Sequence, residues 1–323
     1  MRFHQNMRQN LGLDRNTLLG LTAILLWSST VALARSISEQ LGPLTAGSAV
    51  YLTAGIFLTG FSFWKEHSFK RLQTLPRKYV IGCGALFLVY TTALFLALGL
   101  AANRSQTIEV GLLNYLWPAF TILFSLAILG NKATLWLIPG TLLALFGVFL
   151  VLTHETSVSW SSLSTNLSSN PVAYGLGFLA AISWGLYSNL ARRWGEPNSS
   201  GAVQLFTLGS GIAFGLISLF WPETGVWNLK TVIEVAFLGL ATALAYVFWD
   251  ISMRAGNMVL VAASSYLTPL FSTIVSCIYL GVRPGLGLWL GCAIIIAGSF
   301  LSWFSIRPAN EGKLPAKLQQ EII

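Results

Sequence analysis

Ten long apolar runs, separated by short polar breaks, dominate this sequence of 323 residues. A helix needs about 20 apolar residues to cross the hydrocarbon core of a bilayer, and the runs have roughly that length: 17–35, 44–64, 79–102, 106–129, 134–153, 171–191, 202–221, 231–252, 257–280 and 285–305. Only 9% of the residues are charged, too few to cover the surface of a soluble domain of this size. The pattern predicts an all-α integral membrane protein with ten transmembrane helices. It excludes a soluble enzyme, a disulfide-rich secreted domain and a disordered chain.

The basic residues lie in short patches between these runs, and their distribution predicts how the chain crosses the membrane. If the N-terminus is cytoplasmic, fifteen of the nineteen Lys and Arg residues fall on the cytoplasmic side. The four outside are Arg35, Arg104, Lys230 and Arg283. Cytoplasmic loops of membrane proteins carry such an excess, so we expect a multi-pass protein with both termini in the cytoplasm. Patches placed in this way do not indicate nucleic-acid binding.

The two halves of the chain resemble each other at rare residue types. Trp27 matches Trp184 at an offset of 157, and Pro118 matches Pro269 at an offset of 151. Four glycines follow the second offset, with Gly140 and Gly147 matching Gly291 and Gly298. A constant offset across several Trp, Pro and Gly positions indicates an internal repeat.

Each half contains five predicted helices, and because five is odd the second half must enter the membrane from the opposite side. We predict five-helix repeats over 16–153 and 171–306, joined by a polar periplasmic connection over 154–170, with cytoplasmic tails at 1–15 and 307–323. Inverted repeats are a recurrent plan of secondary transporters, which bind substrate near the membrane midplane between the repeats. The sequence thus predicts a transporter whose partners are membrane lipid and a small-molecule substrate.

Two prolines at equivalent places, Pro118 and Pro269, lie about halfway through their predicted helices. Proline has no N–H to bond the carbonyl four residues before it, so the carbonyls of Asn114 and Ser265 lose their helical partners. In lipid, such groups need another donor. Two interpretations stay open: a kink whose carbonyls are met by neighbouring hydroxyls, or a hinge whose carbonyls contact the substrate.

Aromatic and polar side chains cluster around the depth of these prolines. The candidate substrate-binding residues are Trp27, Tyr90, Asn114, Tyr115, Trp117, Trp184, Tyr187, Ser265 and Tyr266. Such side chains can stack on an aromatic ring and hydrogen-bond a polar head group. Tryptophans at the ends of the runs instead fit the aromatic belts found at membrane surfaces; these are Trp64, Trp136, Trp221 and Trp303.

Two acidic residues, Glu109 and Asp250, are candidates for coupling proton movement to transport. Each also has a structural explanation. Glu109 is expected in the first turn of its helix near Arg104, where an acid suits the helix dipole, and Asp250 lies four residues before Arg254, at ion-pair spacing. Neither acid is at mid-bilayer, so facilitated transport down a gradient stays open beside proton coupling.

No pattern in the sequence indicates catalysis or metal binding. The three histidines, at positions 4, 67 and 154, fall in predicted tails or loops, and the three cysteines lie within apolar runs without metal-ligand spacing. We therefore expect no enzymatic activity, no metal and no cofactor.

Ten spans in two inverted halves resemble the drug/metabolite transporter superfamily, specifically its EamA-type members. The run 108–118 carries the most specific similarity, and Trp27 with the two serines after it and Tyr266-x-Thr268-Pro269 also fit. The resemblance covers nearly all of residues 16–306. It implies export of aromatic amino acids (Phe, Tyr, Trp) by alternating access through a central aromatic-lined cavity in a bacterial inner membrane. Asp250 departs from the family pattern, which has an uncharged residue there.

Two other functions remain open at this stage. One is a broad-specificity metabolite or drug exporter of the same superfamily, and the other is a non-transporting membrane scaffold. The oligomeric state is also open, and a monomer is compatible with the sequence.

Overall fold

The computed structural model describes residues 14–66, 74–153, 160–196, 201–272, 274 and 286–307, and these are mostly helical. A short antiparallel pair of strands joins Lys132–Ala133, before the fifth predicted span, to Ile306–Arg307, after the tenth. The elements are α2 (Arg15–Leu41), α3 (Pro43–Glu66), the π-helix η1 (Lys78–Cys83), α5 (Gly84–Leu100), α6 (Arg104–Asn114), α7 (Trp117–Leu129), β1 (Lys132–Ala133), α8 (Leu137–Thr153), α9 (Trp160–Ser169), α10 (Pro171–Trp194), α11 (Val203–Phe220), α12 (Leu229–Ala255), α13 (Met258–Ser264), the 3₁₀ turn η2 (Ser265–Leu267), α15 (Leu286–Phe304) and β2 (Ile306–Arg307).

Each of the ten predicted spans contains a helix within the described residues. In the part of the chain that the structure describes, five helices are long and apolar enough to cross a membrane: Pro43–Trp64, Lys78–Leu100, Ser105–Leu129, Val203–Phe220 and Leu229–Ala255. Three shorter apolar helices are Leu137–Thr153, Met258–Ser272 and Trp289–Phe304. The all-α membrane-protein fold predicted from the apolar runs is confirmed.

Asparagine side chains begin four of these helices. Asn103, Asn170, Asn228 and Asn257 precede α6, α10, α12 and α13, and each side-chain oxygen accepts a hydrogen bond of 2.9 to 3.3 Å from the N–H three residues on. Such a cap satisfies one of the N–H groups that the first helical turn leaves without a partner. At the C-terminal end of α7, Gly130 adopts the left-handed conformation with φ 71°, which glycine adopts without strain.

The interface between α8 and α15 shows how the two halves are related. Gly140 faces Ser302, and Gly291 faces Val151, so closely that an added Cβ would lie 2.7 Å from each neighbour. Gly140 and Gly291 are equivalent at the offset of 151, and so are Val151 and Ser302, so the two contacts are equivalent as well. The same relation holds for a second set of contacts, Gly147 with Ile295 and Gly298 with Ala144. When exchanging the two helices reproduces the same contacts, the helices are related by a two-fold axis. Residue numbers rise along α8 as those of their partners fall along α15, so these equivalent helices run antiparallel.

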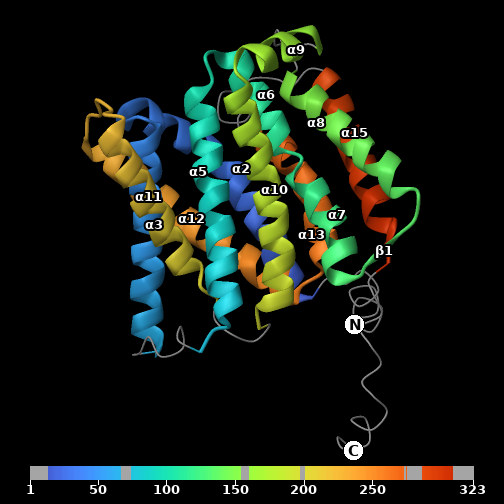
Figure 1. Ribbon diagram of the computed structural model, residues 1–323, viewed down its shortest axis with the longest axis horizontal. Helices are drawn as coiled ribbons and strands as arrows, with labels where there is room; N and C mark the ends of the chain where they lie inside the picture. The colour runs from blue at the N-terminus through green and yellow to red at the C-terminus, as the bar shows by residue number, and fades with distance from the viewer. Residues whose placement is uncertain are drawn as a thin grey trace, which may run out of the picture.

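The interface between α3 and α11 repeats this relation. Gly55 packs against Leu208 and Gly211 packs against Leu52, again with the numbering reversed between the two helices. In addition, α2 packs along α12. Their equivalents in the other repeat, α10 and α5, pack along each other in the same way. Figure 1 shows α3 beside α11 and α8 beside α15. The two inverted repeats predicted from the sequence are therefore confirmed.

Helix α9 lies where we predicted only a polar connection. Its serines, threonine and asparagine have low helix propensity, since they compete with the backbone for hydrogen bonds. Ser162 and Asn166, one turn apart, nevertheless both donate to the buried carboxylate of Glu109, at 2.9 and 3.1 Å. This contact, which the local sequence does not reveal, stabilises the helix.

Candidate functional site

A cluster of aromatic rings fills the centre of the bundle, with Trp184 of α10 in its middle. The ring centroid of Trp184 lies 4.5 Å from that of Tyr90, 5.0 Å from Tyr187 and 5.7 Å from Trp27. Trp117 of α7 meets Trp184 edge-on at 6.3 Å. These separations are typical of attractive aromatic pairs. The structure thus brings together five of the nine residues predicted to bind substrate.

Three rings that the sequence did not single out complete the cluster. Trp249 of α12 lies 5.2 Å from Trp117 and 5.3 Å from Trp27, and Tyr246 lies 5.5 Å from Trp27 and 4.8 Å from Phe87. An aromatic residue within an apolar run is indistinguishable from an ordinary core residue, and only the neighbouring Asp250 marked this part of α12. The aromatic cluster comprises Trp27, Phe87, Tyr90, Trp117, Trp184, Tyr187, Tyr246 and Trp249.

The aromatic cluster is closely packed and draws on both repeats. Trp184 and Trp249 are 1% and 0% exposed. A pocket of about 150 Å³ reaches the edge of the cluster and is lined by Trp27, Tyr51 and Tyr246, among others. The Tyr51 and Tyr246 hydroxyls are 2.6 Å apart and hydrogen-bonded. A ligand that contacts the inner rings from this pocket must therefore part them.

The other predicted binding residues divide between two places. Tyr115 and Tyr266 pack in a separate cluster with apolar residues of α8 and α15. Ser265 donates its hydroxyl to a carbonyl within its own turn. Asn114 is the last residue of α6, and its Oδ1 has no partner among the described residues.

Both prolines lie at interruptions of the helix. The fourth predicted span is divided into α6 and α7, and Pro118 lies in the first turn of α7, where the missing N–H leaves no bond unmade. In the ninth span, η2 separates α13 from the turn that contains Pro269. The Ser265 carbonyl accepts a hydrogen bond of 2.7 Å from the Thr268 hydroxyl. This is the contact that the kink interpretation predicts for that carbonyl.

Glu109 is fully buried at the end of the bundle where α6 begins. Its carboxylate accepts hydrogen bonds from Ser162 and Asn166 of α9, and from the Tyr174 hydroxyl of α10. The prediction that Glu109 lies in the first turn is wrong, because Asn103 caps the helix earlier than the apolar run suggested and places Glu109 in the second turn. The carboxylate joins three helices.

Asp250 forms a buried ion pair with Arg254, with 2.8 Å between Oδ2 and Nε and each side chain 1% exposed. The i, i+4 spacing had indicated this pair. Tyr79 and Tyr187 donate their hydroxyls to the other carboxylate oxygen, Oδ1, at 2.8 and 3.0 Å. These two partners could not be predicted, because only the fold places η1 and α10 against α12. Through Tyr187, the ion pair is connected to the aromatic cluster.

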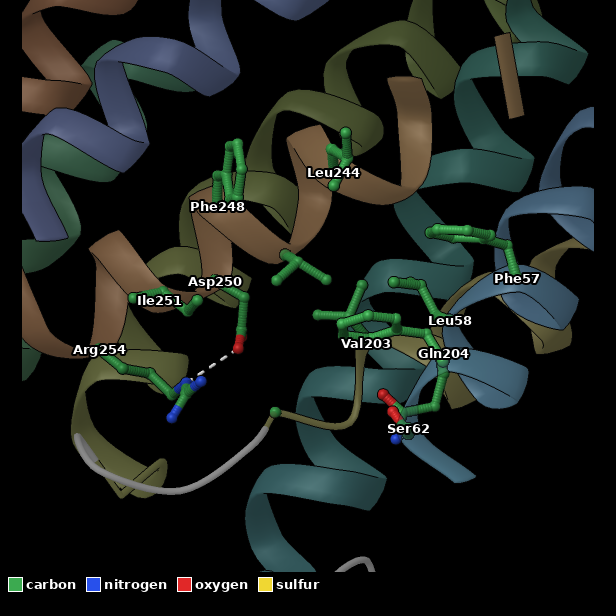
Figure 2. A pocket seen from close by; sticks show the side chains of 13 residues that line it. Phe57, Leu58, Ser62, Val203, Gln204, Leu244, Phe248, Asp250, Ile251 and Arg254 are labelled. Carbon is green, nitrogen blue, oxygen red and sulfur yellow. Dashed lines mark hydrogen bonds and ion pairs between the residues drawn. The ribbon is translucent and has the colours of Figure 1, made fainter. Parts of the chain in front are cut away.

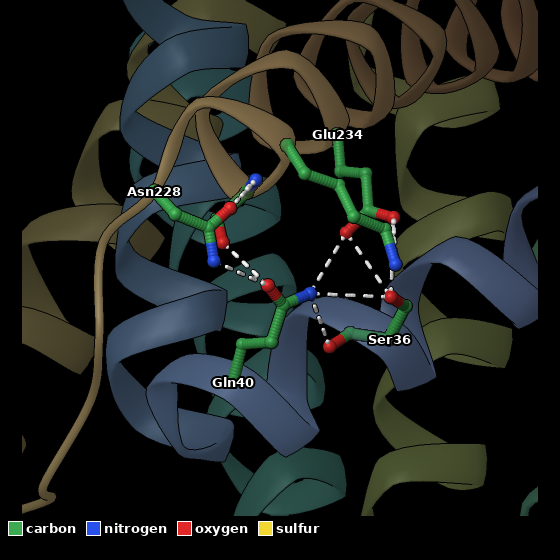
Figure 3. Close-up of polar contacts among 6 residues, drawn as sticks. Ser36, Gln40, Asn228 and Glu234 are labelled. Carbon is green, nitrogen blue, oxygen red and sulfur yellow. Dashed lines mark hydrogen bonds and ion pairs between the residues drawn. The ribbon is translucent and has the colours of Figure 1, made fainter.

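A second polar network joins α2 to the start of α12 (Figure 3). The Ser36 hydroxyl lies 3.1 Å from both carboxylate oxygens of Glu234, and the Gln40 amide donates to the same carboxylate at 3.0 Å. The Gln40 oxygen accepts hydrogen bonds from Thr231 at 2.6 Å and Asn228 at 3.2 Å. Both halves of α12 are thus hydrogen-bonded to the first repeat. The N-terminal half is bonded to α2 through Glu234, and the C-terminal half is bonded to η1 through Asp250.

Comparison with known proteins decides the family. The profile of the EamA-like transporter family matches two stretches of the chain, residues 15–153 and 171–304. The chain belongs to the EamA-like transporter family. Each matched stretch of this EamA-like chain corresponds to five of the predicted spans, so the family profile recurs once in each half.

Relatives span this EamA-like transporter over almost its whole length. The aromatic amino acid exporters YddG of Escherichia coli (strain K12) and Salmonella typhimurium (strain 14028s / SGSC 2262) are each 32% identical over 295 residues, covering 91% of the chain and 98% of the relative. YddG of Ancylobacter novellus is 31% identical, with 88% and 95% covered. A crystal structure with 28% sequence identity superposes with a TM-score of 0.75 over 89% of this chain and 96% of the other. Within the described part of this EamA-like chain, no three His, Cys, Asp or Glu side chains gather as metal ligands.

Proposed function

We propose that this EamA-like transporter exports aromatic amino acids across a bacterial inner membrane by alternating access. The observation that carries the proposal is the aromatic cluster, in which Trp27 and Trp117 of the first repeat meet Trp184 and Trp249 of the second. Inverted-repeat transporters bind substrate between their repeats. Ring faces uncovered there would stack on the side chain of Phe, Tyr or Trp. Three relatives named as aromatic amino acid exporters support the same substrate class.

The proposed cycle needs the packed rings to separate first toward one side of the membrane and then toward the other. The repeats over 16–153 and 171–306 would be the moving units, and the interruptions beside Pro118 and Pro269 would let half-helices reorient. We assign the tails at 1–15 and 307–323 to the cytoplasm and the connection over 154–170 to the periplasm, from the distribution of basic residues.

Release of labelled Phe, Tyr and Trp from proteoliposomes tests the proposal. Trp117→Ala should lower release of at least one of them about tenfold or more, a loss of about 1.4 kcal/mol of transition-state stabilisation. Trp64→Ala is the matched control, because Trp64 is 72% exposed and lies outside the aromatic cluster. Trp117→Phe keeps an aromatic ring and should retain more export than Trp117→Ala.

The same assay separates the alternatives. Unchanged release of all three amino acids by Trp117→Ala would contradict a substrate role for the aromatic cluster. Equal competition by threonine or homoserine would favour a broad-specificity exporter. An imposed pH gradient that accelerates release would indicate proton coupling, and no effect would indicate facilitated export.

A further inference from the structure

A second pocket, of about 450 Å³, lies between α3, the start of α11 and the last turns of α12. Its wall includes the rings of Phe57, Phe61 and Phe248, and its polar lining includes Asp250 and Arg254. Figure 2 shows this acid and this base side by side on α12, with Phe57 across the pocket. Sites for small ligands are typically about 300–1,000 Å³, mostly apolar, with a few convergent polar groups. This pocket has that composition, and no member of the aromatic cluster lines it.

The ion pair in this pocket is not explained by stability. Taking two charges out of water costs several kcal/mol for each ion, so that a buried pair often contributes no net stability. Charged residues within membrane-spanning helices such as Leu229–Ala255 are accordingly rare and mark functional sites. Asp250 Oδ1 is held by two tyrosine hydroxyls, whereas Oδ2 faces Arg254 and the backbone at Gly201. An added Cβ at Gly201 would lie 3.2 Å from Arg254 Nη2 and even closer to Asp250 Oδ2, so only a glycine lets the backbone pass this close to the pair. Because each side chain is 1% exposed, a ligand in the pocket meets these charges only after the groups around them move apart.

We propose that this pocket binds a free α-amino acid, with the ligand ammonium on Asp250, the ligand carboxylate on Arg254 and an aromatic side chain against Phe57, Phe61 and Phe248. A zwitterion carries two opposite charges side by side, as the ion pair does, so each charge of the ligand meets its opposite and the assembly stays neutral. Charge-assisted hydrogen bonds of this kind are roughly twice as strong as neutral ones. The proposal deepens the proposed function and rests on it for the substrate class.

The position of the pocket suits a site that a substrate coming from the cytoplasm occupies before it reaches the aromatic cluster. It lies at the C-terminal ends of α3 and α12, which the basic residues assign to the cytoplasmic side. Tyr187 belongs to the aromatic cluster and also holds Asp250. A ligand bound to Asp250 in this pocket is therefore connected to the aromatic cluster through Tyr187.

Protection of an introduced cysteine from alkylation tests the site. Ser62→Cys places a thiol in the pocket wall, in a background in which Cys83, Cys277 and Cys292 are replaced by alanine and export is retained. Phe at ten times its Kd should slow alkylation at position 62 about tenfold, because about a tenth of the sites stay free. Phe63→Cys is the control, since Phe63 is 51% exposed on the same helix and does not line the pocket; its alkylation should not change.

Two comparisons identify the charged contacts. Phenethylamine lacks the carboxylate and 3-phenylpropionate lacks the ammonium, so each should need at least about tenfold more ligand for equal protection. The double substitution Asp250→Asn with Arg254→Gln leaves no unpaired buried charge, and it should abolish protection by Phe. Its folding is checked by thermal unfolding, and if it does not fold the two analogues decide the question.

Several results would overturn the proposal. These are equal protection by either analogue, protection that survives in the folded double variant, and no protection by Phe in a protein that exports Phe. The last result would leave the proposed function intact, because export and alkylation are measured separately. Absence of aromatic amino-acid release from wild-type proteoliposomes would instead contradict the proposed function.

Discussion

Tyr187 and Tyr266, both buried and both among the predicted binding residues, differ in what their hydroxyl groups contact. The Tyr187 hydroxyl donates to the carboxylate of Asp250 at 3.0 Å. The Tyr266 hydroxyl is buried and has no partner in the described part of the chain. Hydrogen bonds to charged groups are worth about 1.5–3 kcal/mol, and a buried polar group without a partner is destabilising. The same residue type therefore contributes in opposite directions at the two positions.

Substitution of these tyrosines by phenylalanine measures that difference. Tyr187→Phe removes one of the two donors to Asp250 Oδ1 and should lower the free energy of unfolding by about 1.5–3 kcal/mol. Tyr266→Phe removes only the unpartnered hydroxyl and should leave stability unchanged or raise it. Thermal unfolding of both purified variants in one detergent makes the comparison. Equal melting temperatures would show that the hydroxyl of Tyr187 contributes nothing.

Among the elements, the paired helices α8 and α15 depend on glycine for their close approach. A Cβ at Gly147 would lie 2.7 Å from the backbone nitrogen of Ile295, and backbone cannot move aside as a flexible side chain can. Membrane helices associate largely through such close packing, because lipid supplies no hydrophobic drive between them. Gly175 of α10 is different, since an added Cβ there meets nothing within 4 Å.

Alanine at these two glycines should therefore have different effects. Gly147→Ala forces α8 and α15 apart and should cost about 1–3 kcal/mol, as overpacking does. Gly175→Ala should be neutral or stabilising by up to about 1 kcal/mol, because alanine is the better helix former. Melting temperatures in detergent report both. A Gly147→Ala protein as stable as wild type would mean that the interface of α8 and α15 tolerates repacking.

At the scale of the whole molecule, α12 is bonded to the first repeat both at its start and near its end. Glu234 contacts Ser36 and Gln40 of α2, and Asp250 contacts Tyr79 of η1. Both connections join the two repeats, so if the repeats move relative to each other during transport, each connection must break during the cycle. A covalent link at either place should therefore stop export.

Cysteines at positions 36 and 234 test this requirement. After oxidation, Ser36→Cys with Glu234→Cys in a cysteine-free background should release substrate from proteoliposomes at less than about a tenth of its reduced rate, a difference of about 1.4 kcal/mol. Dithiothreitol should restore the rate, which makes the reduced protein its own control. Full export by the cross-linked form would contradict a rearrangement between α2 and α12.

The orientation of the molecule is tested by labelling intact cells. Ala102 and Ala133 are exposed at opposite ends of the helical segment formed by α6 and α7. The distribution of basic residues places position 102 outside and position 133 inside. A membrane-impermeant maleimide should therefore label Ala102→Cys in intact cells and Ala133→Cys only after lysis. The reverse pattern would show that both termini are periplasmic.

The sequence by itself determined the membrane fold, the two inverted repeats and the interruptions near Pro118 and Pro269. These properties depend on local composition, on the length of apolar runs and on rare residues at a constant offset. The pairing of Asp250 with Arg254 was also predictable, because residues four apart on a helix are neighbours.

Only the tertiary structure decided which of the predicted binding residues share a site. Trp249 joined the aromatic cluster, whereas Tyr115 and Tyr266 packed against α8 and α15 instead. The physical reason is that these helices are apolar on nearly every side, so no polar stripe marks the face that each turns to the centre. Contacts between residues 60 to 200 positions apart, such as Tyr187 with Asp250 and Ser36 with Glu234, depend on those faces and arise only when the helices pack.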